Sequence, residues 1–246
     1  MFPREPEEHT AEFDRYAADY DAGMDNPLKR LAGSDAESFI EVKVDWLLRR
    51  PFLRRLFDDR YSSVRLLDYG CGAGTMLSTL RRRGFAGSLA GCDVSPEMLA
   101  EAQRRWRLGP PPNLRLIESV GAPFADCDFD VVILSSVLHH IDLAVRPRVY
   151  ADVMRLVKPG GLICIFEHNP YNPITRWVVS HTPIDTNAVL LKSSEVCAEL
   201  RLAGVVRPRT SYIMFFPPRL TLLRTVEDML QWLPLGAQYV VCADRV

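Results

Sequence analysis

Residues 64–75, VRLLDYGCGAGT, carry the pattern that most narrows the fold of this 246-residue chain. An apolar run leads into Asp68, and three glycines then alternate at Gly70, Gly72 and Gly74. An apolar run followed by glycines predicts a buried strand and a tight turn into a helix. Glycine suits such a turn because it adopts unusual backbone dihedrals and lets a ligand approach with no Cβ in the way. The pattern therefore predicts a turn that presents bare backbone to a small ligand.

Two ligand classes use a glycine-rich turn of this kind: dinucleotides, and ligands that present a cationic group to a neighbouring acid. The dinucleotide fingerprint G-x-G-x-x-G places a pyrophosphate on a helix N-terminus. Counted from Gly70, the third glycine of that fingerprint would fall at Thr75, so it is missing. The spacing is G-x-G-x-G instead, and the acid Asp68 precedes it, which favours a cationic ligand group over a pyrophosphate.

A second acid, Asp93, closes the apolar run SLAGCD at residues 88–93. Its distance from the glycine turn is the one expected of a ribose-binding acid in a strand–helix–strand unit. A carboxylate at the end of a strand can accept hydrogen bonds from both ribose hydroxyls. Ser95 and Pro96 then suit the N-cap and the first residue of a helix.

The first acid and the three glycines resemble motif I of the class I S-adenosylmethionine methyltransferases. The resemblance covers most of the chain, because DFDVVILSSVLHHI (128–141) and LVKPGGLICIFE (156–167) are similar to the fourth and fifth strand segments of that family. It implies S-adenosylmethionine as the cofactor, with Asp68 facing the amino group of the methionine moiety and Asp93 the ribose. The cofactor contacts that the resemblance implies are Asp68, Gly70, Gly72, Gly74, Asp93, Val94, Met98, Glu118, Ser119, Val120 and Ser135, with Tyr16 and Tyr20 added by a lid.

From Val64 onward, strand-like and helix-like segments alternate, which indicates a doubly wound sheet with ligands at the carboxyl ends of its strands. We expect an α/β fold of the Rossmann-like methyltransferase type, with a seven-stranded, mostly parallel sheet and helices on both faces. Lys158–Gly161 predicts a turn between a helix and the fifth strand. The expected strands are 64–68, 88–92, 113–118, 129–135, 161–167, 205–215 and 238–244, and the expected helices between them are 75–83, 96–107, 146–157 and 194–203.

Residues 1–60 precede this alternation and are predicted to be helical, at FDRYAADYD (13–21), near 39–48 and in PFLRRLF. FDRYAADYD resembles the N-terminal helix that closes over the cofactor in many small-molecule methyltransferases. We therefore predict an N-terminal helical extension or lid at 1–60 and a cofactor-binding methyltransferase domain at 61–246.

The segment FEHNPYNPITRWVVSHTPIDTNAVLL (166–191), with LPLGAQY (233–239), resembles a bacterial subgroup that carries E-H-N-P-x-N-P-x-T after the fifth strand. That subgroup is associated with small-molecule, sugar-linked or natural-product acceptors. Pro170 and Pro173 are expected to exclude regular structure, and each biases the preceding asparagine toward an extended backbone. The prediction is a stiff polar loop at the ligand edge of the sheet, and the alternative is a plain proline-rich turn.

Composition limits the other function classes. The chain is 48% hydrophobic and 25% charged, as in ordinary soluble proteins, and no apolar run is long enough to span a bilayer. The start, MFPREPEEHT, lacks a signal-peptide pattern, so we expect a cytoplasmic protein.

A net charge of −1 argues against a nucleic-acid partner. Arginines cluster near 49–55 and 81–83; we interpret them as solvated helix faces, with a basic patch for an anionic acceptor as the alternative.

The six cysteines show no C-x-x-C pairing, which argues against a structural zinc site or a disulfide framework. The candidate general bases are His139, His140, Glu167 and His168. Histidine can accept a proton near neutral pH, which suits an O–H or N–H acceptor, although a packing role is the alternative for each. A metal site is not predicted, because these histidines lack a second ligand pair at fixed helical spacing.

These motifs predict an enzyme: an S-adenosylmethionine-dependent methyltransferase that acts on an oxygen or nitrogen of a small molecule. One alternative is a nucleic-acid (RNA) methyltransferase, suggested by the arginines, and another is a non-catalytic S-adenosylmethionine-binding partner protein. The main task of such an enzyme is to exclude water and align the acceptor with the methyl group. The identity of the acceptor and the oligomeric state stay open.

A further apolar pattern lies in TLLRTVEDMLQWLPLG (221–236). Its apolar residues recur at helical spacing and are expected to lie mostly in the core. Residues 1–50 and the 168–191 loop are expected to roof the ligand edge of the sheet, since function concentrates on loops over a rigid scaffold. The apolar residues of this helical pattern are Leu222, Leu223, Val226, Met229, Leu230 and Leu233.

Overall fold

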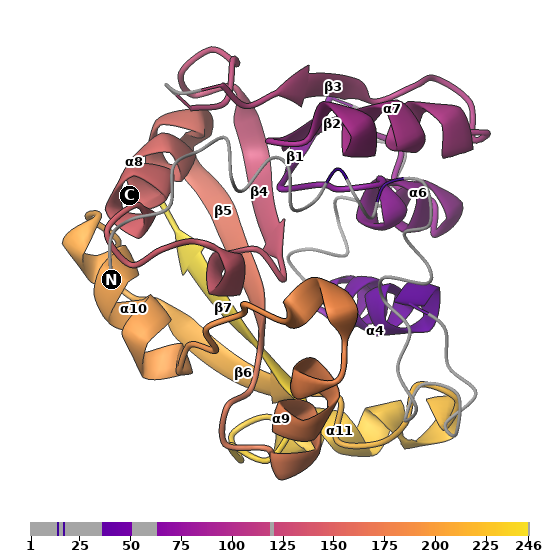
Figure 1. Ribbon diagram of the computed structural model, residues 1–246, viewed down its shortest axis with the longest axis vertical. Helices are drawn as coiled ribbons and strands as arrows, with labels where there is room; N and C mark the ends of the chain where they lie inside the picture. The colour runs from indigo at the N-terminus through magenta and orange to yellow at the C-terminus, as the bar shows by residue number, and fades with distance from the viewer. Residues whose placement is uncertain (1–13, 15–16, 18–35, 51–62, 119–120, 246) are drawn as a thin grey trace.

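The structure, a computed structural model, describes residues 14, 17, 36–50, 63–118 and 121–245. They form one seven-stranded sheet in the order β3-β2-β1-β4-β5-β7-β6 (Figure 1). Only β7 runs antiparallel to its neighbours β5 and β6, and the other pairings are parallel. The predicted α/β class and the mostly parallel seven-stranded sheet are therefore confirmed. The strands are β1 Arg65–Tyr69, β2 Ser88–Asp93, β3 Asn113–Leu116, β4 Phe129–Ser135, β5 Val157–His168, β6 Arg209–Ile213 and β7 Gln238–Asp244.

Helices cover both faces of the sheet (Figure 1). Helices α8 and α10 pack on one face around Tyr150 and Leu200, and α4 and α6 pack on the other around Trp46 and Leu77. No helix in the described part of the chain is long and apolar enough to cross a membrane. The helices are α4 Ala36–Arg49, α6 Thr75–Arg82, α7 Pro96–Arg105, α8 Arg146–Leu156, α9 Pro173–Ser180, α10 Ser193–Leu202 and α11 Arg224–Leu230, with short 3-10 helices η3 Leu138–His140, η4 Pro183–Asp185 and η5 Thr221–Leu223.

The order of the strands determines where a ligand can bind. Strands β1 and β4 are neighbours at the centre, and the chain winds outward from them in both directions. The crevice of a doubly wound sheet lies at the carboxyl ends of the strands where the winding reverses. Asp68, Asp93, Ser135 and Glu167 all stand at or near the carboxyl ends of β1, β2, β4 and β5.

Two predicted irregular segments are wrong in detail. The predicted turn Lys158–Gly161 belongs to β5, where the pairing with β4 shifts between Phe129 and Val131, so the extra residues bulge out of the ladder. The 168–191 segment was predicted to lack regular structure, yet it contains α9 and η4. Pro173 starts α9 instead of preventing it, because proline is well tolerated at the first position of a helix.

The predicted core stripe of residues 221–236 is also wrong. Leu222 is 92% exposed and Met229 is 76% exposed, whereas the buried residue of α11 is Glu227. The carboxylate of Glu227 accepts hydrogen bonds from the backbone N–H groups of Phe215 and Phe216. The helical spacing thus indicated the helix correctly but not the face that is buried. That face carries Glu227, whose carboxylate fixes α11 to the segment that follows β6.

Candidate active site

The glycine turn between β1 and α6 has the backbone that the sequence predicted. Gly70, Gly72 and Gly74 have φ angles of 77°, 49° and 76°, in the left-handed region that favours glycine. A Cβ on Gly70 would lie 2.6 Å from Cγ2 of Val137, so a side chain does not fit there. A Cβ on Gly72 would meet no atom of residues 36–50, 63–118 and 121–245 within 4 Å. The protein therefore leaves no room for a side chain at Gly70, whereas the turn at Gly72 leaves space that a ligand can occupy.

Asp68 lies just before this turn and is buried, with 1% of its surface exposed. Its Oδ1 has no hydrogen-bond partner among the described residues. Burial, helped by the negative charge of Asp93, raises the pKa of Asp68 to about 7, against the opposing charge of Lys43. A buried carboxylate oxygen without a partner is costly, so this position calls for a cationic or hydrogen-bond-donating ligand group.

Asp93 links the glycine turn to the start of α7. Its Oδ2 accepts a hydrogen bond of 2.7 Å from the backbone N–H of Gly72, and its Oδ1 accepts one of 3.0 Å from that of Ser95. Burial raises the pKa of Asp93, and these N–H groups oppose the rise. Each oxygen keeps a second lone pair, so the carboxylate can still accept from a ribose. The structure thus gives Asp93 a positioning role that the sequence argument lacked.

Ser95 caps α7, as predicted, by accepting a hydrogen bond from the N–H of Met98. The Ser95 hydroxyl in turn donates to Oδ1 of Asp14. Met98 packs in one small cluster with Ala17, Ala73 and Ile184. The described residues of the N-terminal segment therefore lie at the ligand edge, next to the glycine turn and η4.

Four of the predicted cofactor contacts lie outside the described residues: Tyr16, Tyr20, Ser119 and Val120. Val94 is half-buried, and Glu118 is exposed and forms an isolated bridge with Gly121. Ser135 ends β4, at the carboxyl edge of the sheet. The structure thus brings Ser135 to the edge formed by Asp68, Asp93 and the glycine turn. The N-terminal lid, the domain division at residues 60 and 61, and the roles of these residues stay predictions.

Lys43 is a site residue that the sequence analysis missed. It extends from α4, is 2% exposed, and donates hydrogen bonds of 2.9 Å and 3.0 Å to the hydroxyls of Ser135 and Ser136. Burial lowers its pKa to about 8, although the carboxylates of Glu167, Asp68 and Asp185 oppose the change. One signal was available: Lys43 takes an inward position in the apolar stripe of its helix, where charged residues are rare.

A second set of polar side chains gathers at the ends of β4 and β5. Oε1 of Glu167 accepts hydrogen bonds from the backbone N–H groups of Val137 and Leu138, and its Oε2 lies 2.5 Å from Nδ1 of His139. Nε2 of His139 faces Oδ1 of Asp185 at 3.6 Å. Both ring nitrogens of His139 therefore face carboxylates, and all three side chains are buried.

The charges in this set determine which histidine holds a proton. Burial alone would lower the pKa of His139, but Glu167 and Asp185 outweigh it and raise the pKa to about 10. Burial alone would raise the pKa of Glu167, but the charge and hydrogen bond of His139 lower it to about 2. His139 and Glu167 thus form a buried ion pair, which leaves neither side chain suited to accept a proton from an acceptor.

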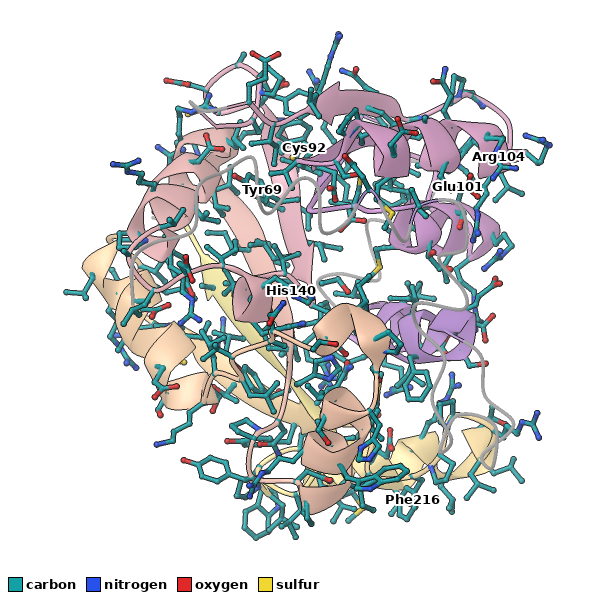
Figure 2. The ribbon with its side chains drawn as sticks, in the orientation of Figure 1. Tyr69, Cys92, Glu101, Arg104, His140 and Phe216 are labelled. Carbon is teal, nitrogen blue, oxygen red and sulfur yellow. The ribbon has the colours of Figure 1, made fainter. Side chains whose placement is uncertain are left out.

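The other two candidate bases differ from His139. Burial and the charge of His139 lower the pKa of His140 to about 3 and that of His168 to about 4, so both imidazoles are uncharged at neutral pH. Both residues are half-buried rather than fully enclosed. Figure 2 shows His140 in the middle of the molecule. Nε2 of His140 lies 3.5 Å from the same Asp185 oxygen that faces His139.

The E-H-N-P-x-N-P-x-T segment anchors the chain that supplies Asp185. The buried side-chain amide of Asn169 donates to the backbone oxygens of Pro234 and Gly236, at 3.0 Å and 2.8 Å. The Thr175 hydroxyl donates to the oxygen of Ala237. The two segments that the sequence analysis paired, 166–191 and 233–239, are therefore in direct contact. The motif residues Asn169 and Thr175 fix the loop to the segment just before β7.

Replacing Asn169 by alanine is expected to lower the free energy of unfolding by about 2–3 kcal/mol, because two carbonyl oxygens lose their partner. The midpoint of urea denaturation measures this change. Asn113→Ala, at an exposed position at the start of β3, is the control and should change the midpoint little. Equal midpoints for the two variants would show that the motif does not anchor the loop.

Comparison with known proteins agrees with this geometry. Residues 66–161 match the sequence model of a methyltransferase domain. These residues form a methyltransferase domain. A SAM-dependent methyltransferase of Thermotoga maritima, described as a possible histamine N-methyltransferase, superposes over 96% of this chain and 99% of its own, with a TM-score of 0.64 and 15% identity. This likeness confirms the fold.

Two curated relatives extend the comparison of the methyltransferase domain. A phthiotriol/phenolphthiotriol dimycocerosates methyltransferase of Mycobacterium leprae is 30% identical over 149 residues, which cover 58% of this chain and 51% of that protein. A demethylmenaquinone methyltransferase of Thermobifida fusca is 29% identical over 167 residues, which cover 61% and 68%. The chain thus spans about half of the first relative and two thirds of the second. The match of residues 66–161 agrees with the predicted methyltransferase class, for which S-adenosylmethionine is the expected cofactor.

The residues at the carboxyl edge of the sheet fit this cofactor. The buried Oδ1 of Asp68, for which the described residues provide no partner, is suited to an ammonium group, and the open face of Gly72 leaves room for a ligand beside the turn. Asp93 holds Gly72 in place and has lone pairs left for hydroxyl donors. The donors and acceptors at this edge therefore match an amino acid joined to a ribose.

Proposed function

We propose that this protein is an S-adenosylmethionine-dependent methyltransferase that methylates an oxygen or nitrogen of a small molecule. The observation that carries the proposal is the buried Oδ1 of Asp68, which has no partner in the described part of the chain and lies next to a glycine turn that is open to a ligand. The names of the two relatives support a small-molecule acceptor, since one is a phthiotriol/phenolphthiotriol dimycocerosates methyltransferase and the other a demethylmenaquinone methyltransferase.

S-adenosylmethionine, when bound, supplies an activated methyl group on a sulfonium. Asp68 holds the ammonium end, and Asp93 receives the ribose hydroxyls while it fixes Gly72. Lys43 holds Ser135 and Ser136 at the end of β4, so that the backbone there keeps one position. The glycine turn and the end of β4 thereby orient the cofactor between them, and orientation of this kind accounts for much of the rate of a transfer reaction.

The acceptor is proposed to lie on the side of β4 and β5, against the histidines. His139 acts as a positioning residue, since both of its ring nitrogens face carboxylates. His140 and His168 present the half-buried imidazoles that can contact the acceptor. The proline-rich segment 168–191, with Asp185 on it, closes this side of the site.

A nucleic-acid acceptor finds less support in the side chains. Arg49 and Arg50 both pair with Asp228, Arg82 pairs with Glu37, and Arg83 pairs with Asp45 at 3.0 Å. Arg81 donates to the backbone oxygens of Phe85 and Gly87. Arginines that are paired within the protein contribute little to phosphate binding, which relies on unneutralised basic groups.

The proposal is tested by calorimetry with S-adenosylmethionine and S-adenosylhomocysteine, followed by methyl transfer from labelled cofactor to a panel of phenols, amines and reduced quinones. One-to-one binding and a labelled product are expected. Absence of binding at millimolar ligand would end the proposal. Binding of both ligands without any transfer would favour the non-catalytic binding protein instead.

Asp93→Ala is expected to weaken the binding of S-adenosylhomocysteine by about 10- to 100-fold, because a charged acceptor of hydrogen bonds contributes about 1.5–3 kcal/mol. Calorimetry measures the dissociation constant. The control is Asp126→Ala, since that carboxylate is exposed and pairs only on the surface with Arg155. An unchanged dissociation constant for Asp93→Ala would remove this residue from the site.

A further inference from the structure

We propose that His139, His168 and Asp185 bind a divalent transition-metal ion at the carboxyl ends of β4 and β5. Among the described residues, these three each place one ligand atom so that all the atoms lie within 4.8 Å of one another. Two imidazoles and one carboxylate form the donor set of many zinc and iron(II) sites. The histidines show no second ligand pair at helical spacing in the sequence, because the third proposed ligand, Asp185, comes from a separate segment.

The separations within the cluster suit an ion. Nε2 of His139 and Oδ1 of Asp185 are 3.6 Å apart. Two ligands of a tetrahedral Zn²⁺ ion, each about 2.1 Å from the metal, lie about 3.4 Å apart. Nε2 of His140 lies 3.5 Å from the same oxygen, which brings a third imidazole next to the site. The other separations between the three ligand atoms are at most 4.8 Å, and they close to about 3.4 Å when the side chains surround an ion.

Glu167 matches the outer partner of a metal-bound histidine. A metal-bound histidine usually gives its other ring N–H to a carboxylate or carbonyl, which fixes the orientation of the ring. Nδ1 of His139 has this partner in Glu167, at 2.5 Å. Nδ1 of His168 lies 3.5 Å from the amide nitrogen Nε2 of Gln238, which donates, so that contact suits a His168 ring whose Nδ1 carries no proton. Of the two proposed histidine ligands, His139 has the acceptor behind it that a metal-bound ring uses.

The backbone holds Asp185 toward the histidines. The N–H of Val189 donates to the carbonyl oxygen of His139 at 2.8 Å, and the N–H of Ala188 donates to the oxygen of Asp185. These bonds connect the segment after η4 directly to η3. In the protein without metal, the proton on His139 and the ammonium group of Lys43 balance the buried charges of Asp185 and Glu167. A divalent ion takes the place of the proton on Nε2 of His139 beside Asp185, so its binding releases a proton.

The test uses the full chain without an affinity tag, stripped of metal with a chelator. Titration with Co²⁺, followed by its visible absorption, and calorimetry with Zn²⁺ measure binding in the absence of S-adenosylmethionine. We expect one ion per chain, and a loss of affinity of at least about 100-fold in Asp185→Asn and His168→Gln. His181→Gln, at an exposed histidine that stacks on Trp177, is the matched control and should bind as the wild type does.

Circular dichroism and S-adenosylhomocysteine binding show whether each variant is folded. If the wild type binds no Co²⁺, or if Asp185→Asn binds it equally well, the proposal is overturned and the cluster is a hydrogen-bond network held by a proton on His139. Because the metal titration needs no cofactor, its failure leaves the proposed methyltransferase activity to its own test.

Discussion

Asp68→Asn is expected to weaken the binding of S-adenosylhomocysteine by about 100-fold. The asparagine keeps the size of the side chain but removes the charge, and a hydrogen bond to a charged group contributes about 1.5–3 kcal/mol. Calorimetry at pH 8 measures the loss. Asp244→Asn serves as the control, since Asp244 is an exposed carboxylate at the end of β7. Equal affinities in the two variants would show that Asp68 does not bind the ammonium group.

The same residue makes cofactor binding depend on pH. Because the pKa of Asp68 in the protein without ligand is about 7, protonation competes with an ammonium group below that pH. The dissociation constant of the wild type is expected to rise about tenfold between pH 8 and pH 6. Asp68→Asn should lose this part of the pH dependence. An equally steep profile in the variant would assign the titration to another group.

Ionisation of Asp68 favours cofactor binding but lowers the stability of the folded protein. Its folded pKa of about 7 lies above the ordinary value of 3.8, so the folded state binds the proton more tightly than the unfolded state does. The contribution to stability is therefore complete below about pH 4 and is lost as the pH rises through 7. Asp68→Asn removes the buried charge, so the variant without ligand should be more stable than the wild type at pH 8. A site residue that costs stability is expected where the ligand supplies the missing partner.

Much of the cofactor half of the site could be predicted from the sequence, because its residues are local. Asp68 and the three glycines lie in one strand and one turn, and Asp93 lies on the next strand at a fixed distance. The positive φ angles of Gly70, Gly72 and Gly74 follow from the same pattern. Local patterns of this kind fix both the turn and the edge of the sheet to which it belongs.

The rest of the site, including the part proposed to face the acceptor, could be predicted less well, because distant segments assemble it. Lys43 comes from α4, His139 from η3 and Asp185 from η4, and no spacing in the sequence connects the three. The inner face of α11 was misjudged for a related reason, since Glu227 is buried by hydrogen bonds to Phe215 and Phe216 rather than by apolar packing. Polar contacts between distant segments leave little periodic signal in a sequence.

Glu167→Gln is expected to lower the free energy of unfolding by about 3–5 kcal/mol. Loss of one partner of a buried ion pair leaves the other without compensation, and here the remaining partner is His139. In the wild type, Nδ1 of His139 and the backbone N–H groups of Val137 and Leu138 all bond to oxygens of Glu167. In the variant, the NH2 group of the glutamine must face one of these two sets of donors, so a hydrogen bond is lost on that side. Since a domain has about 5–15 kcal/mol of stability in total, this is a large share.

The urea midpoint of Glu167→Gln, measured at pH 7 on protein without metal or cofactor, gives the size of the effect. The matched control is Glu97→Gln on the exposed first turn of α7, where the same change of charge should cost less than about 0.5 kcal/mol. A small effect at both positions would mean that the ion pair with His139 contributes no more than a surface charge. A large effect at Glu167 alone would identify this carboxylate as the group that holds η3, and with it His139 and His140, at the end of β4.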